Sequence, residues 1–104
     1  MRRIHVALAV SSYAVAVQEY TARLGRPPCC TVEGTYALWR TEHVNMSISA
    51  KPDEAGTLRH LGFEDTDATD FAEEMDSQGF VWERFSPEDQ NAEILKRWPH
   101  AKFH

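Results

Sequence analysis

The stretch RIHVALAV, residues 3–10, returns in altered form as RHLGF, residues 59–63. Each copy places a histidine, His5 or His60, directly before a triplet of apolar, small and apolar residues. A glycine follows 20 residues after the first histidine and 19 residues after the second. This agreement in order and length predicts an internal repeat with a period of about 55 residues.

The first half of the chain has the pattern of a strand, a helix and three further strands. Ser12 can cap the helix with its hydroxyl group, and Gly25 ends it. Residues 44–50 alternate between apolar and polar side chains, which is typical of a strand with one buried face. The expected strands are 3–10, 29–33, 36–41 and 44–50.

The second half begins with the same pattern after a loop at residues 51–56. We expect a strand at 58–64, a helix from Ala68 that ends at Gly79, a strand at 80–85 and a last helix at 86–98. The sequence therefore predicts an α+β fold in a single domain over residues 1–104. The first module covers about 3–50, the second about 57–85, and the C-terminal helix about 86–98.

Composition excludes several classes of function. The 104 residues are 42% hydrophobic and 26% charged, as in an ordinary globular domain. The net charge is −5 with scattered basic residues, so we expect no binding of nucleic acid. No apolar run approaches the roughly 20 residues of a membrane span, so we expect no membrane partner. The adjacent Cys29 and Cys30 do not form a disulfide framework, and we expect a packed pair of thiols in a cytoplasmic protein.

Four segments together resemble the vicinal oxygen chelate superfamily, which contains glyoxalase I, extradiol dioxygenases and bleomycin-resistance proteins. The segments are RIHVALAV (3–10), YTARLGRPP (20–28), GTLRHLGFED (56–65) and DFAEEMDSQGF (70–80). The stretch of residues 34–64 is most similar to the cadmium-induced and organoarsenical-lyase branch, in which a run similar to GTLRHLG opens the second module. The resemblance implies paired βαβββ modules whose sheets curl around a cup that holds a divalent metal ion.

The resemblance also implies candidate site residues. His5 and His60 match the positions at which the first strand of each module supplies a metal ligand. Neutral imidazoles bind divalent ions such as Zn, Ni, Fe or Mn. The polar face of residues 44–50, which carries Asn45, Ser47 and Ser49, would line the cup.

The sequence departs from the family pattern where the remaining ligands should stand. In the family these are carboxylates near the ends of the fourth strand of each module, and residues 44–50 contain none. The second module is expected to be shortened to βαβ plus the C-terminal helix, without its carboxylate ligand. We therefore expect an incomplete metal site. The shortened sheet would leave an open edge, which predicts a homodimer.

The sequence is compatible with three functions and identifies no catalytic residue. The first is a metal-dependent lyase, isomerase or dioxygenase that acts on a small molecule. The second is a small-molecule-binding protein of the same fold, for resistance or sequestration, that has lost its metal site. The third is an interaction protein whose cup is filled by aromatic side chains such as Tyr36 or Trp39.

Overall fold

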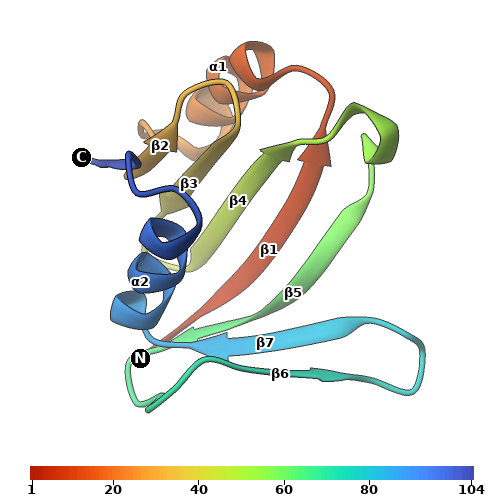
Figure 1. Ribbon diagram of the computed structural model, residues 1–104, viewed down its shortest axis with the longest axis vertical. Coiled ribbons are helices and arrows are strands. Elements are labelled where there is room, and N and C mark those ends of the chain that lie inside the picture. The colour runs from red at the N-terminus through yellow and green to blue at the C-terminus, as the bar shows by residue number, and fades with distance from the viewer.

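An eight-stranded mixed sheet organises the chain in the computed structural model, which describes residues 1–104 (Figure 1). The strands are β1 (Arg2–Val10), β2 (Cys30–Val32), β3 (Tyr36–Arg40), β4 (Val44–Ala50), β5 (Leu58–Asp65), β6 (Ala72–Met75), β7 (Val81–Phe85) and β8 (Lys102–Phe103). The helices are α1 (Tyr13–Leu24) and α2 (Pro87–Arg97), with a short 3-10 helix η1 (Pro52–Glu54). The predicted α+β class is confirmed. Neither helix is long and apolar enough to cross a lipid bilayer.

The strand order is β6-β7-β5-β1-β4-β3-β2-β8, with the pair β1 and β5 near the middle of the sheet. These two strands run antiparallel to each other. On one side β1 pairs in parallel with β4, which pairs antiparallel with β3. On the other side β5 pairs in parallel with β7, which pairs antiparallel with β6. The pairing pattern is thus the same on both sides of the central pair.

Helix α1 covers one face of the sheet. The Ser12 hydroxyl accepts a hydrogen bond from the Val15 backbone at the start of the helix, and Gly25 ends it in a left-handed conformation. Its apolar side packs against a core that includes the fully buried Trp39 and Ile48. Burial of this apolar side holds the helix on the sheet.

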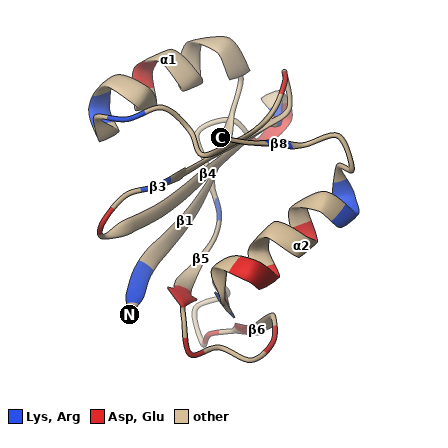
Figure 2. Ribbon diagram, turned by 90° about the vertical axis from the view of Figure 1, so that its left-hand side faces the viewer, with Lys and Arg blue, Asp and Glu red and all other residues tan.

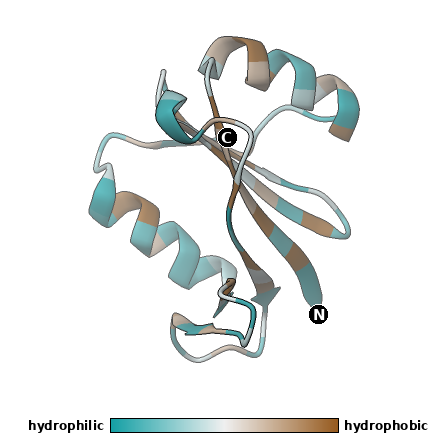
Figure 3. Cartoon of the chain, turned by 90° about the vertical axis from the view of Figure 1, so that its right-hand side faces the viewer, coloured by the Kyte–Doolittle hydropathy of each residue, from teal (hydrophilic) through white to brown (hydrophobic).

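Helix α2 lies on the opposite face, so the sheet runs between the two helices (Figures 2 and 3). Ser86 and Asp89 form a reciprocal capping box at its start, as the sequence predicted for a helix from residue 86. Ile94 then packs against Tyr36 and Leu38 of β3. We call this side of the sheet the cup face.

The predicted helix from Ala68 to Gly79 is wrong, because this segment contains strand β6 instead. Phe71 stacks on Phe85 with ring centroids 5.4 Å apart, and the residues after it pair with β7. The Asp76 carboxylate accepts hydrogen bonds from the backbone of Gln78 and Phe80, which closes a turn between β6 and β7. Such local side-chain bonds compete with a helix. The second half is therefore three strands before α2, not βαβ.

Candidate metal centre

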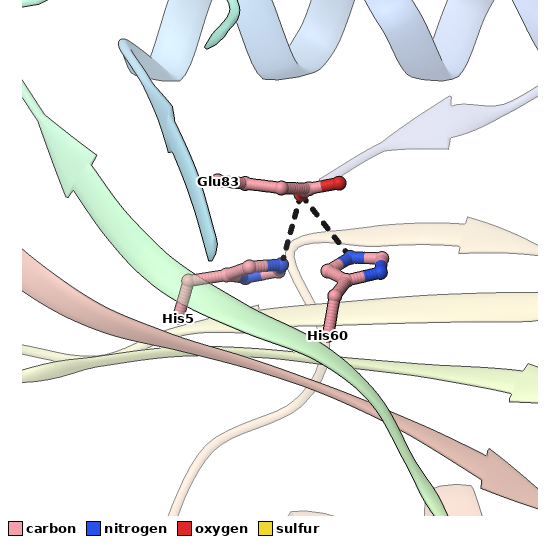
Figure 4. A group of neighbouring side chains, drawn as sticks. All are labelled: His5, His60 and Glu83. Atoms are coloured by element: carbon pink, nitrogen blue, oxygen red, sulfur yellow. Dashed lines mark ion pairs between the residues drawn. The ribbon is translucent and has the colours of Figure 1, made fainter. Parts of the chain in front are cut away.

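His5, His60 and Glu83 converge on the cup face from three neighbouring strands, β1, β5 and β7 (Figure 4). The Nε2 atom of His60 lies 3.1 Å from Oε1 of Glu83, and Nε2 of His5 lies 3.6 Å from the same oxygen. The imidazole rings are 5.1 Å apart between centroids. The three potential ligand atoms all lie within 4.8 Å of one another, so this group could hold a metal ion.

Gly62 allows the three strands to bring these side chains together. It lies opposite His5 on β1 and beside Glu83 on β7. A Cβ atom at this position would lie 1.9 Å from the backbone oxygen of Glu83. The absence of a side chain therefore lets β7 approach β5 closely enough for Glu83 to reach the histidines.

An amide beneath the cluster orients the His5 ring. Nδ1 of His5 lies 2.8 Å from Oδ1 of Asn45, and both side chains are buried. The amide nitrogen of Asn45 donates to the Glu64 carboxylate at 2.9 Å, so the oxygen must face His5 as an acceptor. The proton of His5 therefore resides on Nδ1, and Nε2 keeps its lone pair. That Nε2 atom is buried without a hydrogen-bond partner.

Buried charges hold this amide in place. Glu64 is 1% exposed and forms ion pairs with Arg3 and Arg40. Arg40 also donates to the Gln90 side chain at 2.7 Å, and Gln90 in turn bonds to Asn45. Because every member of this network is paired, the orientation of Asn45 is fixed from below.

The protonation states favour ligation. Burial lowers the pKa of the His60 imidazole to about 4, and burial also lowers the pKa of His5. Burial raises the pKa of the Glu83 carboxyl to about 7, and the nearby Glu73 carboxylate adds to this effect. Both imidazoles are therefore neutral near pH 7, which is the form that binds metal ions.

A cavity of about 450 Å³ opens beside the cluster. Ser47 and Ser49 line it, whereas Asn45 lies beneath it, fully buried behind His5. Tyr36 contributes to the wall without filling the space, and Trp39 lies in the core under α1. Further lining residues are Arg59, Phe71, Phe85, Lys96, Arg97 and Trp98.

Glu83 was not among the predicted site residues, and the expectation of a cluster without a carboxylate is wrong. His5 and His60 do lie together, as the repeat predicted. The strand that carries Glu83 lay within the predicted range 80–85, and alternation places Glu83 on the same face as the buried Phe85. That alternation was the available signal. The carboxylate was instead expected on a further strand after residue 85, where helix α2 begins.

The remaining cysteines and histidines lie outside the cluster. Cys30 is fully buried, and burial raises the pKa of its thiol to about 11, while burial also raises the pKa of Cys29. Such thiols pack as small apolar groups, as expected. His43 is exposed in a turn, and His104 contacts the Thr31 hydroxyl beside strand β8.

Comparisons with known proteins give a likeness of fold alone. No protein-family model matches the sequence, and no curated protein matches it. A chain in the crystal structure of NAD-dependent benzaldehyde dehydrogenase from Legionella pneumophila is similar in structure, with a TM-score of 0.54. The match covers 80% of this chain and 97% of that chain at 12% sequence identity.

Proposed function

We propose that this protein binds a divalent metal ion through His5, His60 and Glu83 and presents it to a small molecule in the adjoining cavity. The observation that carries the proposal is the Nε2 atom of His5, which is buried without a hydrogen-bond partner. A buried polar atom without a partner costs about 1–3 kcal/mol. A metal ion shared with His60 and Glu83 would supply the missing partner.

The donor set fits a borderline divalent ion. Two neutral imidazoles and one carboxylate suit Zn, Ni, Fe or Mn and leave other coordination positions free. A bound ion would act as a Lewis acid toward oxygen atoms of a ligand in the cavity. The protein's own part is to hold His5 in one tautomer through Asn45 and to give up the Glu83 proton when the ion binds.

We further propose that the fold is a shortened pair of modules of the vicinal oxygen chelate type. The matching pairings on both sides of β1 and β5 support this proposal, with β7 in the place of β4 and β6 in the place of β3. Ala7, two residues after His5, pairs with Ser47 on β4. Gly62, two residues after His60, pairs with Glu83 on β7. Glu83 thus takes the position on its strand that Ser47 takes on β4. The second module would then lack its helix and one strand.

The reaction that follows from such a site is that of a metal-dependent lyase, isomerase or dioxygenase. The alternative is a binding protein that captures a small molecule without metal. The neutral histidines and the cavity beside them favour this alternative as the second candidate, because a ligand could enter without displacing a charge.

Metal binding by the purified protein tests the proposal. Elemental analysis and calorimetric titration with Zn, Ni, Fe(II) and Mn should give one ion per chain. His60→Ala and Glu83→Gln should each lose most of the affinity. His43→Ala removes an exposed histidine and is the matched control, which should bind as the unaltered protein does. A protein that takes up none of these ions overturns the metal proposal, and ligand binding by metal-free protein then supports the alternative.

We also propose a homodimer. Strand β6 ends the sheet with four exposed residues, so one row of its backbone groups is free to pair. On the face opposite the cup, Phe63 and Trp82 stack with centroids 6.1 Å apart and have no helix of their own. Light scattering after size exclusion should give twice the chain mass, and a monomer across micromolar concentrations would contradict the dimer.

A further inference from the structure

Arg59 is a cation in the cavity that forms no ion pair, although its charge acts on the Glu83 carboxyl across the same cavity and offsets part of the rise that burial gives the pKa of that group. It precedes His60 on β5, is half-buried, and lines the cavity. The only hydrogen bond of its side chain goes from Nη1 to the Ser49 hydroxyl, at 3.2 Å. By contrast, Arg3 and Arg40 on the same face are both paired with the buried Glu64. A half-buried guanidinium that donates to no carboxylate keeps donors free for a ligand in the cavity that it lines.

Two more cations stand at the same cavity. Lys96 and Arg97 lie in the last turn of helix α2 and line the cavity. The helix is acidic in its first turn and basic at this end (Figure 2). Neither forms an ion pair, although Arg97 lies over the ring of Trp98. The only acids that line the cavity are Glu83 and Glu93. In a chain of net charge −5, this cavity is therefore a local excess of positive charge.

The walls between these cations are aromatic. Phe71 and Phe85 stack with ring planes 9° apart, and Tyr36 and Trp98 lie 4.9 Å apart between centroids. A space of about 450 Å³ suits a small molecule. Flat apolar groups pack well against such walls.

We infer that the cavity binds a small carboxylic acid with a flat apolar body, whose carboxylate pairs with Arg59. This inference names a ligand class for the proposed function and rests on it for the role of the neighbouring metal. A planar guanidinium matches a carboxylate with two parallel hydrogen bonds, which an uncharged amide cannot reproduce.

Binding of phenylacetate and phenylacetamide, measured by calorimetry or by ligand-observed NMR, tests the ligand class on the unaltered protein. The two probes differ only in the charged group. Phenylacetate should bind about 10- to 100-fold more tightly, as expected for one charged hydrogen-bonded pair. Equal affinities, or no binding of either probe, would overturn the inference.

Two arginine variants then assign the contact. Arg59→Gln should weaken phenylacetate binding about 10- to 100-fold and leave phenylacetamide unchanged. Arg23→Gln changes the net charge equally on the exposed side of α1 and should leave both affinities unchanged. Loss of phenylacetate preference in Arg23→Gln as well would refute a specific contact.

Parallel metal titrations separate the two proposals. Phenylacetate preference that depends on Arg59 in a protein that binds no metal would leave the ligand class standing and remove the metal function. Metal binding without any preference for phenylacetate would leave the metal function standing and remove the ligand class.

Discussion

Substitution of Gly62 by alanine tests whether close strand packing builds the His5, His60 and Glu83 cluster. The added Cβ would lie 1.9 Å from the backbone oxygen and 2.6 Å from the backbone nitrogen of Glu83. An ordinary contact needs about 3.4 Å. The obstacle is backbone in a paired strand, so a flexible side chain cannot swing aside to relieve it.

The size of the effect follows from this geometry. Strand β7 must retreat from β5 by about 1.5 Å, the difference between the ordinary contact and the distance in the structure. Such overpacking costs about 3 kcal/mol. For a domain of this size, that lowers the melting temperature by about 12–24 °C. Glu83 would move with its strand, and ligand distances of about 2.0–2.2 Å tolerate no such displacement.

Thermal unfolding and metal titration of Gly62→Ala measure both effects. The variant should melt well below the unaltered protein and bind metal no better than Glu83→Gln. The double variant Gly62→Ala/Glu83→Gln should bind metal no worse than either single variant, because each single substitution already removes Glu83 as a ligand. Gly34→Ala is the matched control. Gly34 is also a positive-φ glycine, but an added Cβ there has no neighbour within 4 Å, so it should cost about 1 kcal/mol and leave metal affinity unchanged.

A Gly62→Ala protein that melts within a few degrees of the original and keeps its metal affinity would refute this reasoning. It would mean that β7 shifts without cost or that Glu83 is not a ligand. The titration of Glu83→Gln, made with the same samples, decides between these two explanations.

Two further predictions concern pH and helix α2. Burial raises the Glu83 pKa to about 7 and lowers the His60 pKa to about 4, so of these two ligands only Glu83 must lose a proton to a metal ion between pH 5 and pH 7, and neither must do so well above pH 7. Apparent affinity should therefore rise about 90-fold from pH 5 to pH 8 and level off above pH 7, whereas a steeper rise centred on pH 6.5 would show that the histidines titrate normally. Ser86→Ala removes the capping hydroxyl of α2 and should lower the free energy of unfolding by about 1 kcal/mol, measured in urea, with Ser77→Ala in an exposed turn as the control.

The strands and caps were predictable because their signals are local. Residues 44–50 alternate in polarity and form β4 with the same bounds, and the capping serines start both helices near the predicted residues. The pairing of His5 with His60 came from the repeat, which is also a property of the sequence. These features need no knowledge of distant contacts.

The segment 66–80 could not be predicted in the same way. Ala68, Phe71 and Met75 have helical spacing, yet the turn made by Asp76 and the pairing with β7 outweigh it. The position of Glu83 depends on that pairing and on the close approach at Gly62. A contact set by a missing side chain on another strand leaves no periodic trace in the sequence.

Three buried polar side-chain atoms lack a hydrogen-bond partner, and they are not equivalent. Thr21 Oγ1 and Trp39 Nε1 belong to α1 and to the core beneath it, and neither belongs to the cluster of potential ligands. His5 Nε2 is an acceptor, since Asn45 fixes the proton on the other nitrogen, and it lies 3.6 Å from a carboxylate oxygen that His60 also reaches. Above pH 7, where Glu83 is ionised, this acceptor faces a second neutral acceptor and a carboxylate, and a cation bound between them would stabilise all three groups. The buried network beneath it, with every group paired, would be an unnecessary cost for a histidine that only fills space.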